Sequence, residues 1–89
     1  DAVLYIESRD RFTLVHTASK SYPTSSTISN WSKELPSFVR THRSMLVNPE
    51  HVVASSKSGL TVAQGDFSME IPISRTYSES VAEALVAKA

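Results

Sequence analysis

The chain contains no cysteine, only two glycines and no long apolar run. Without cysteine it has no disulfide, no thiolate metal site, no iron–sulfur cluster and no cysteine nucleophile. No apolar run approaches the ~20 residues that a membrane-spanning helix needs, so we predict no membrane segment. The length of 89 residues fits one small domain. Its first residues include no Met and no signal sequence, and we therefore expect a domain excised from a longer protein.

The charges balance, with nine Lys and Arg against nine Asp and Glu. A protein that neutralises DNA phosphates usually has a net basic charge, so this balance argues mildly against nucleic-acid binding. The distribution is uneven, however, because residues 9–43 are net basic and the stretch from residue 50 onward is net acidic. A neutral total can therefore hide a basic face.

The N-terminal part of the chain has the pattern of β-strands. Residues 3–6 and 12–17 are rich in β-formers, and the second run approximately alternates apolar and polar residues. The link Glu7–Arg11 has no Gly or Pro, which favours a short polar loop projecting two arginines over a tight hairpin. Residues 21–23 predict a third strand, which Pro23 confines to a sheet edge or ends.

The middle of the chain predicts one helix and further strands. In the segment Thr27–Leu35, apolar residues Ile28, Trp31 and Leu35 share one helical face. Ser26 or Thr27 can cap this helix, and Pro36 ends it. The pattern then predicts, in order, an extended piece at 38–40, a polar interruption at 41–44, a strand at 45–47 and a turn at 48–50.

The C-terminal part predicts a β-meander followed by a helix. Short strands are expected at residues 51–54, 60–63 and 67–71, with Gly59 and Gly65 in the turns. A terminal helix is expected over 76–88. The fold class is therefore mainly β, with antiparallel sheets, one short middle helix and one C-terminal helix. The candidate core residues are Tyr5, Trp31, Phe38, Leu46, Val62, Ile73 and Leu85.

Catalytic and metal-binding patterns are weak. None of His16, His42 and His51 has a metal-ligand spacing, so we predict no metal and no cofactor. His42 lies close to Ser44, which suggests a hydrolase. Two such neighbours rarely align for catalysis, however, and the chain has no G-x-S-x-G motif. His16 lies inside an apolar strand and is interpreted as structural. We predict that the protein is not an enzyme.

Three arginines, Arg11, Arg43 and Arg75, each stand at the end of a predicted strand or in the loop beside it. The planar fork of arginine suits guanine edges and phosphates, and binding residues are often presented on loops. The alternative for each is a solvated arginine or a weak surface salt bridge. The hydroxyls of Ser44, Ser74 and Thr76 flank these arginines and can serve as phosphate contacts or turn caps.

Three motifs, in the correct order, resemble the LytTR DNA-binding domain. Phe38–Asn48 is similar to the family signature F-x-R-x-H-R-S-x-[LIV]-V-N, preceded by a helix ending in Leu35-Pro36. Residues 4–7 resemble the opening strand with its Tyr-Ile-Glu, and Ile71–Tyr77 resembles the closing I-P-[IV]-S-R-x-[YF] box. The resemblance covers essentially the whole chain, 1–89.

The resemblance implies a cytoplasmic effector domain of a bacterial transcription regulator, whose loops enter successive major grooves of double-stranded DNA. It also implies an upstream receiver or sensor domain and one further strand before residue 4. The zero net charge suggests modest affinity for one copy, and hence a second copy bound on repeated sites. The same charge supports the alternative, a protein-interaction module on this scaffold with weak or no DNA affinity.

The resemblance also implies roles for individual residues. Arg43 and Arg75 match the family's base-contacting positions, and Arg11 or Arg9 matches the first contact, in the loop between the opening strands. Phosphate-contacting or loop-supporting roles are expected for Arg9, Lys20, Arg40, His42, Ser44, Ser74 and Thr76.

Overall fold

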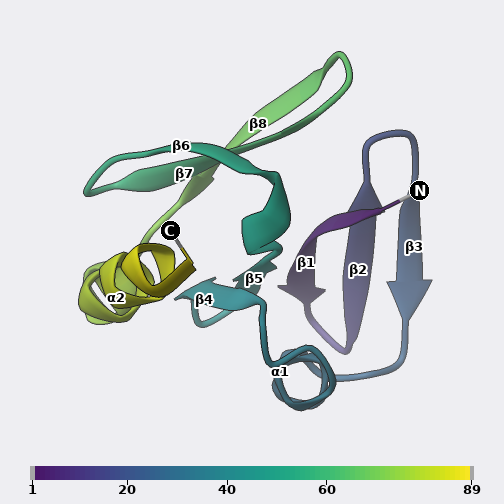
Figure 1. The fold of residues 1–89 in the computed structure, drawn as a ribbon. Helices are drawn as coiled ribbons and strands as arrows, with labels where there is room; N and C mark the ends of the chain where they lie inside the picture. The colour runs from purple at the N-terminus through teal and green to yellow at the C-terminus, as the bar shows by residue number, and fades with distance from the viewer. Residues whose placement is uncertain (1, 89) are drawn as a thin grey trace.

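The computed structural model describes residues 2–88, which form two antiparallel sheets with two α-helices (Figure 1). This arrangement confirms the expected mainly β fold. The five-stranded sheet has the order β3-β2-β1-β5-β4, and the three-stranded sheet has the order β6-β7-β8. The strands are β1 (Val3–Arg9), β2 (Phe12–Thr17), β3 (Ser21–Thr24), β4 (Val39–His42), β5 (Met45–Val47), β6 (Val52–Ser55), β7 (Gly59–Gln64) and β8 (Phe67–Pro72). The helices are α1 (Ile28–Glu34), α2 (Ser78–Lys88) and the short 3₁₀ helices η1 (Pro49–His51) and η2 (Arg75–Tyr77).

Strands β1 and β2 form a tight hairpin, which corrects the expected polar loop over residues 7–11. Arg9 pairs with Phe12, so the connection contains only Asp10 and Arg11. Asp10 has a left-handed φ of 47°, which Asp tolerates better than most residues other than Gly and Asn. Strand β3 is an edge strand, as Pro23 indicates.

Helix α1 follows the predicted pattern closely. The Thr27 side chain caps it by accepting a hydrogen bond from the Asn30 N–H at 3.1 Å. The helix ends at Glu34, before Pro36. Ile28 is buried, and the Trp31 indole N–H donates to Thr13 Oγ1 at 3.0 Å. These contacts hold α1 against the five-stranded sheet.

Several predicted boundaries differ from the structure. Strand β1 runs to Arg9 rather than ending at residue 6, and Gly59 begins β7 rather than lying in a turn. Strand β4 continues to His42, which pairs with Met45, so the interruption at 41–44 becomes a two-residue turn of Arg43 and Ser44. His51 belongs to η1 rather than to a strand, since the Asn48 side chain accepts from the Glu50 N–H and starts a 3₁₀ turn. Helix α2 begins at Ser78, because η2 occupies residues 75–77.

Two clusters make up the core. The larger cluster lies between the sheets and α2 and contains Leu4, Tyr5, Val39, Met45, Val47, Leu60, Val62, Ile71 and Val81. The smaller cluster packs under α1 and contains Ile6, Val15, Ile28 and Leu46. Of the expected core residues, Tyr5, Leu46 and Val62 are buried. Trp31, Phe38, Ile73 and Leu85 are only partly buried, because they pack against the margins of these clusters.

Candidate nucleic-acid interface

The three arginine-bearing segments follow one another along one end of the five-stranded sheet. The Ser8 N–H donates to the Ser44 carbonyl at 2.8 Å, which joins the end of β1 to the β4–β5 turn. The Ser74 N–H donates to the Thr41 carbonyl at 2.8 Å, which joins β4 to the segment before η2. Arg11, Arg43 and Arg75 are all exposed at this end. We call these three residues the arginine row.

The turn that carries Arg43 is held by hydrogen bonds from the neighbouring side chains of Arg40 and His42. Arg40 Nε donates to the His42 carbonyl at 3.0 Å, and the Arg40 guanidinium also donates to the Arg43 carbonyl. His42 Nδ1 accepts from the Ser44 N–H at 3.3 Å and lies 3.0 Å from Ser44 Oγ. The backbone on both sides of the exposed Arg43 side chain is therefore fixed.

Arg40 also links the Arg43 turn to the Arg75 segment. Its guanidinium carbon lies 5.8 Å from the centre of the Tyr77 ring, in cation–π geometry. Ser74 lies in the same region, and its hydroxyl is buried without a hydrogen-bond partner among residues 2–88. The Arg40 guanidinium is therefore turned toward the protein, and Ser74 is joined to β4 through its backbone N–H, whereas Thr76 is exposed.

The hairpin tip offers two arginines in different electrostatic settings. The guanidinium of Arg9 lies 3.5 Å from Glu7 Oε1 and forms an ion pair. Arg11 stands in the turn itself, is exposed, and has no acidic partner within the part of the chain that the structure describes. Arg11 is therefore the uncompensated cation of this hairpin.

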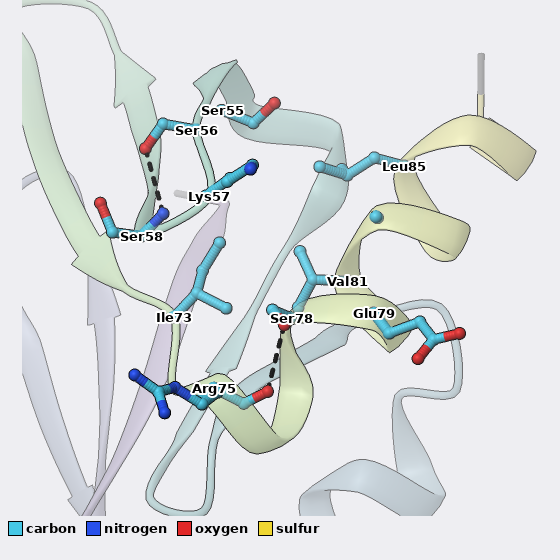
Figure 2. Close-up of a pocket in the computed structure, with 11 residues that line it drawn as sticks. Ser55, Ser56, Lys57, Ser58, Ile73, Arg75, Ser78, Glu79, Val81 and Leu85 are labelled. Carbon is cyan, nitrogen blue, oxygen red and sulfur yellow. Dashed lines mark hydrogen bonds between the residues drawn. The ribbon is translucent and has the colours of Figure 1, made fainter.

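Arg75 lies at the rim of a cavity of about 770 Å³ between the β6–β7 turn and α2 (Figure 2). Its guanidinium extends away from α2, while its backbone carbonyl accepts from Ser78 Oγ at 3.1 Å. Lys57 lines the same cavity from the β6–β7 turn, which is tied to the closing segment by the Ile73 N–H···Ser58 carbonyl bond at 2.9 Å. Sequence reasoning missed Lys57 because a single lysine in a serine-rich turn matches no binding motif.

The structure does not bring Lys20 to the arginine row. Lys20 lies in the β2–β3 turn, at one end of β2, whereas Arg11 lies in the β1–β2 turn at the other end. The whole length of β2 therefore separates the two turns (Figure 1).

The comparisons with known proteins agree with this geometry. The sequence profile of a family described as the LytTr DNA-binding domain matches residues 1–86. The chain belongs to the LytTR family. A solved LytTr DNA-binding domain of a methyl-accepting/DNA response regulator from Bacillus cereus has a TM-score of 0.78 and 26% identity. The alignment covers 93% of this chain and 80% of that one. No curated protein shows significant similarity to the chain.

LytTR domains bind DNA and are not catalytic, which confirms that the protein is not an enzyme. His42 and Ser44 do lie within hydrogen-bonding distance of each other, with 3.0 Å between Nδ1 and Oγ. Because His42 Nδ1 accepts from the Ser44 N–H as well, the pair closes the turn of this LytTR domain. Within residues 2–88 no three His, Asp or Glu side chains gather at a metal-binding distance, and no helix could span a membrane.

Proposed function

We propose that this LytTR domain recognises specific sequences in double-stranded DNA through the arginine row, with Arg11, Arg43 and Arg75 contacting bases in the major groove. The observation that carries the proposal is the pair of backbone hydrogen bonds that align the three segments at one end of the sheet. Each arginine can form a bidentate pair with a guanine, worth about 1–3 kcal/mol of discrimination against the wrong base.

The surrounding polar residues divide into phosphate contacts and supports. His42, Ser44 and Thr76 flank the row and are assigned to phosphates, together with Lys57 beyond Arg75. Arg40 is assigned to loop support because its guanidinium donates to two carbonyls of the Arg43 turn, and Ser74 because its N–H donates to the Thr41 carbonyl. Arg11 rather than Arg9 is assigned to the first base contact because Glu7 compensates Arg9. Lys20 is left out of the interface.

The domain acts as the cytoplasmic effector of a response regulator, downstream of a receiver or sensor domain. With no net charge, one copy releases few counterions in total, and its affinity is expected to be modest. Two copies on repeated sites would raise the affinity through the high effective concentration of the second copy.

The decisive experiment is selection of bound duplexes from a random library at near-physiological salt, with wild type and Arg43→Ala in parallel. We expect a recurrent motif for wild type that disappears in the variant. Equal enrichment by both proteins would contradict base contact by Arg43. No enrichment by wild type, combined with elution from a DNA column at low salt, would favour the protein-interaction alternative, which the zero net charge supports.

A further inference from the structure

Glu7 lies behind the hairpin tip and has two partners. Its Oε1 atom is 3.1 Å from His16 Nε2 and 3.5 Å from the Arg9 guanidinium. Tyr5, Glu7 and Arg9 alternate along β1 and therefore lie on one face of the sheet. His16 joins this face because it pairs with Tyr5 across the hairpin. The Glu7 carboxylate thus connects His16 of β2 to Arg9 at the end of β1.

His16 fixes the position of this carboxylate. The histidine side chain is only 14% exposed, and its ring stacks on Tyr5 with centroids 4.3 Å apart. Its Nδ1 atom lies 2.7 Å from Ser21 Oγ, so both ring nitrogens are engaged. The assignment that fits a neutral ring has Nε2–H donating to Glu7 and Nδ1 accepting from Ser21. Glu7 is consequently held on the sheet surface rather than free to swing into solvent.

We propose that Glu7 is a positioning residue that determines which arginine of the hairpin contacts DNA. Because Glu7 pairs with Arg9, Arg11 is the arginine of the hairpin tip that is available to contact DNA. As long as Arg9 stays paired with Glu7, its charge is partly neutralised within the protein, and it should contribute less than an unpaired arginine to phosphate contact and counterion release. This inference rests on the proposed function, since it concerns the same DNA-binding face.

The test is the salt dependence of DNA binding by Glu7→Gln, measured by fluorescence anisotropy with a selected and a scrambled duplex. Glutamine keeps an oxygen that can accept from His16 but has no charge to hold Arg9. The plot of log affinity against log salt should steepen by about 0.9, the value for one further phosphate contact. This slope corresponds to about 3.5-fold more loss of affinity between 50 and 200 mM salt. The fold-gain at low salt should be similar on both duplexes, because a phosphate contact is independent of sequence, so the ratio of the two affinities should stay unchanged.

A double-mutant cycle separates this effect from a general change in charge. Arg9→Gln alone should leave the slope unchanged, and Glu7→Gln/Arg9→Gln should lose the gain of Glu7→Gln. Arg11→Gln, at the same tip, should lower affinity. Glu50→Gln makes the same charge change in η1, beyond the far end of β5, and should leave the slope unchanged. Thermal unfolding of each variant confirms folding.

Three results would overturn the inference. The first is an unchanged slope in Glu7→Gln, and the second is a gain that persists without Arg9. The third is a slope that falls by about 0.9 in Arg9→Gln alone, because Arg9 would then already contact a phosphate. This third arm does not depend on the folding of any Glu7 variant. Wild type that binds neither duplex would overturn the proposed function as well, whereas the first three results leave it standing.

Discussion

The turns that carry Arg43 and Arg11 lie at the same end of the same sheet but are stabilised differently. Arg40 donates to the carbonyls of His42 and Arg43, and the Ser44 N–H donates to His42. The tip of the β1–β2 hairpin instead has a left-handed residue, Asp10, beside an arginine with no acidic partner among residues 2–88. A group already held in its binding geometry loses less entropy on binding. If both arginines contact DNA as proposed, the Arg43 turn should bind with its geometry already set, whereas the Arg11 side chain should lose more freedom on binding.

Alanine substitution of the two arginines tests this difference most directly. Arg43→Ala should weaken binding to the selected duplex about 10–100-fold and change binding to a scrambled duplex much less, since a bidentate base contact is worth about 1–3 kcal/mol. Arg11→Ala should cost about 3–10-fold on the selected duplex, as expected of a less ordered contact. Anisotropy titrations at one salt concentration measure both losses. Equal losses for the two variants, or equal losses on the two duplexes, would contradict the distinction.

Removing the hydrogen bonds that Arg40 donates to the Arg43 turn should reduce the difference in order between this turn and the Arg11 turn. Arg40→Met keeps a long apolar stem but removes both donors, and hydrogen bonds from a charged group contribute about 1.5–3 kcal/mol. Because the outer bond is exposed, we expect a loss of about 1–2 kcal/mol in the free energy of unfolding, measured by urea denaturation. Binding to the selected duplex should fall several-fold although Arg43 is present.

Arg40→Lys is the control, because it keeps the charge but not the fork that reaches two carbonyls. It should give an intermediate loss of stability and of specificity. Suppose instead that Arg40→Met keeps full specificity and lowers the salt slope by about 0.9. Arg40 would then be a phosphate contact rather than a support.

The hairpin tip can be altered without touching the Arg43 turn. Asp10→Val should destabilise the protein by about 1–2 kcal/mol, since a β-branched residue is strongly disfavoured at a left-handed φ. Asp10→Gly, which accepts this φ freely, should be neutral or slightly stabilising. Urea denaturation of both variants measures whether each substitution lowers or raises the free energy of unfolding. Similar stability of the valine and glycine variants would show that the tip adjusts its backbone and does not need the left-handed residue.

The sequence predicted regular elements better than the contacts between them. Alternation gave the bounds of β2 correctly, and apolar spacing with the Thr27 cap identified α1. The tight hairpin was missed because its turn has no Gly or Asn, and pairing down to Arg9 and Phe12 places Asp10 in the left-handed region. The proximity of Arg43 and Arg75 depends on the Ser74–Thr41 hydrogen bond, which joins residues distant in sequence. No local pattern encodes such a contact, so the positions of the arginines at strand ends and the motif resemblance could single them out but could not show that their segments are joined.

The smallest expected effect is a loss of stability at high pH that depends on Tyr5, which lies in β1 away from the hairpin tip. Burial, followed by the charge of Glu7, raises the pKa of Tyr5 above its ordinary value of about 10, and Arg9 acts in the opposite direction. The neutral phenol is thus favoured in the folded state. Its contribution to stability is complete below pH 10 and is lost as the pH rises through the folded-state pKa.

Wild type should therefore lose stability above pH 10 more steeply than Tyr5→Phe, in urea denaturations from pH 8 to 11. At pH 8 the phenylalanine variant should be less stable by about 1 kcal/mol or less, because it lacks the Tyr5 hydroxyl that donates to Met69 Sδ at 3.0 Å. Tyr22→Phe, at an exposed position of β3, is the matched control and should follow the wild-type curve. Parallel curves for wild type and Tyr5→Phe would show that the pKa of Tyr5 is not raised in the folded state, by burial or by Glu7.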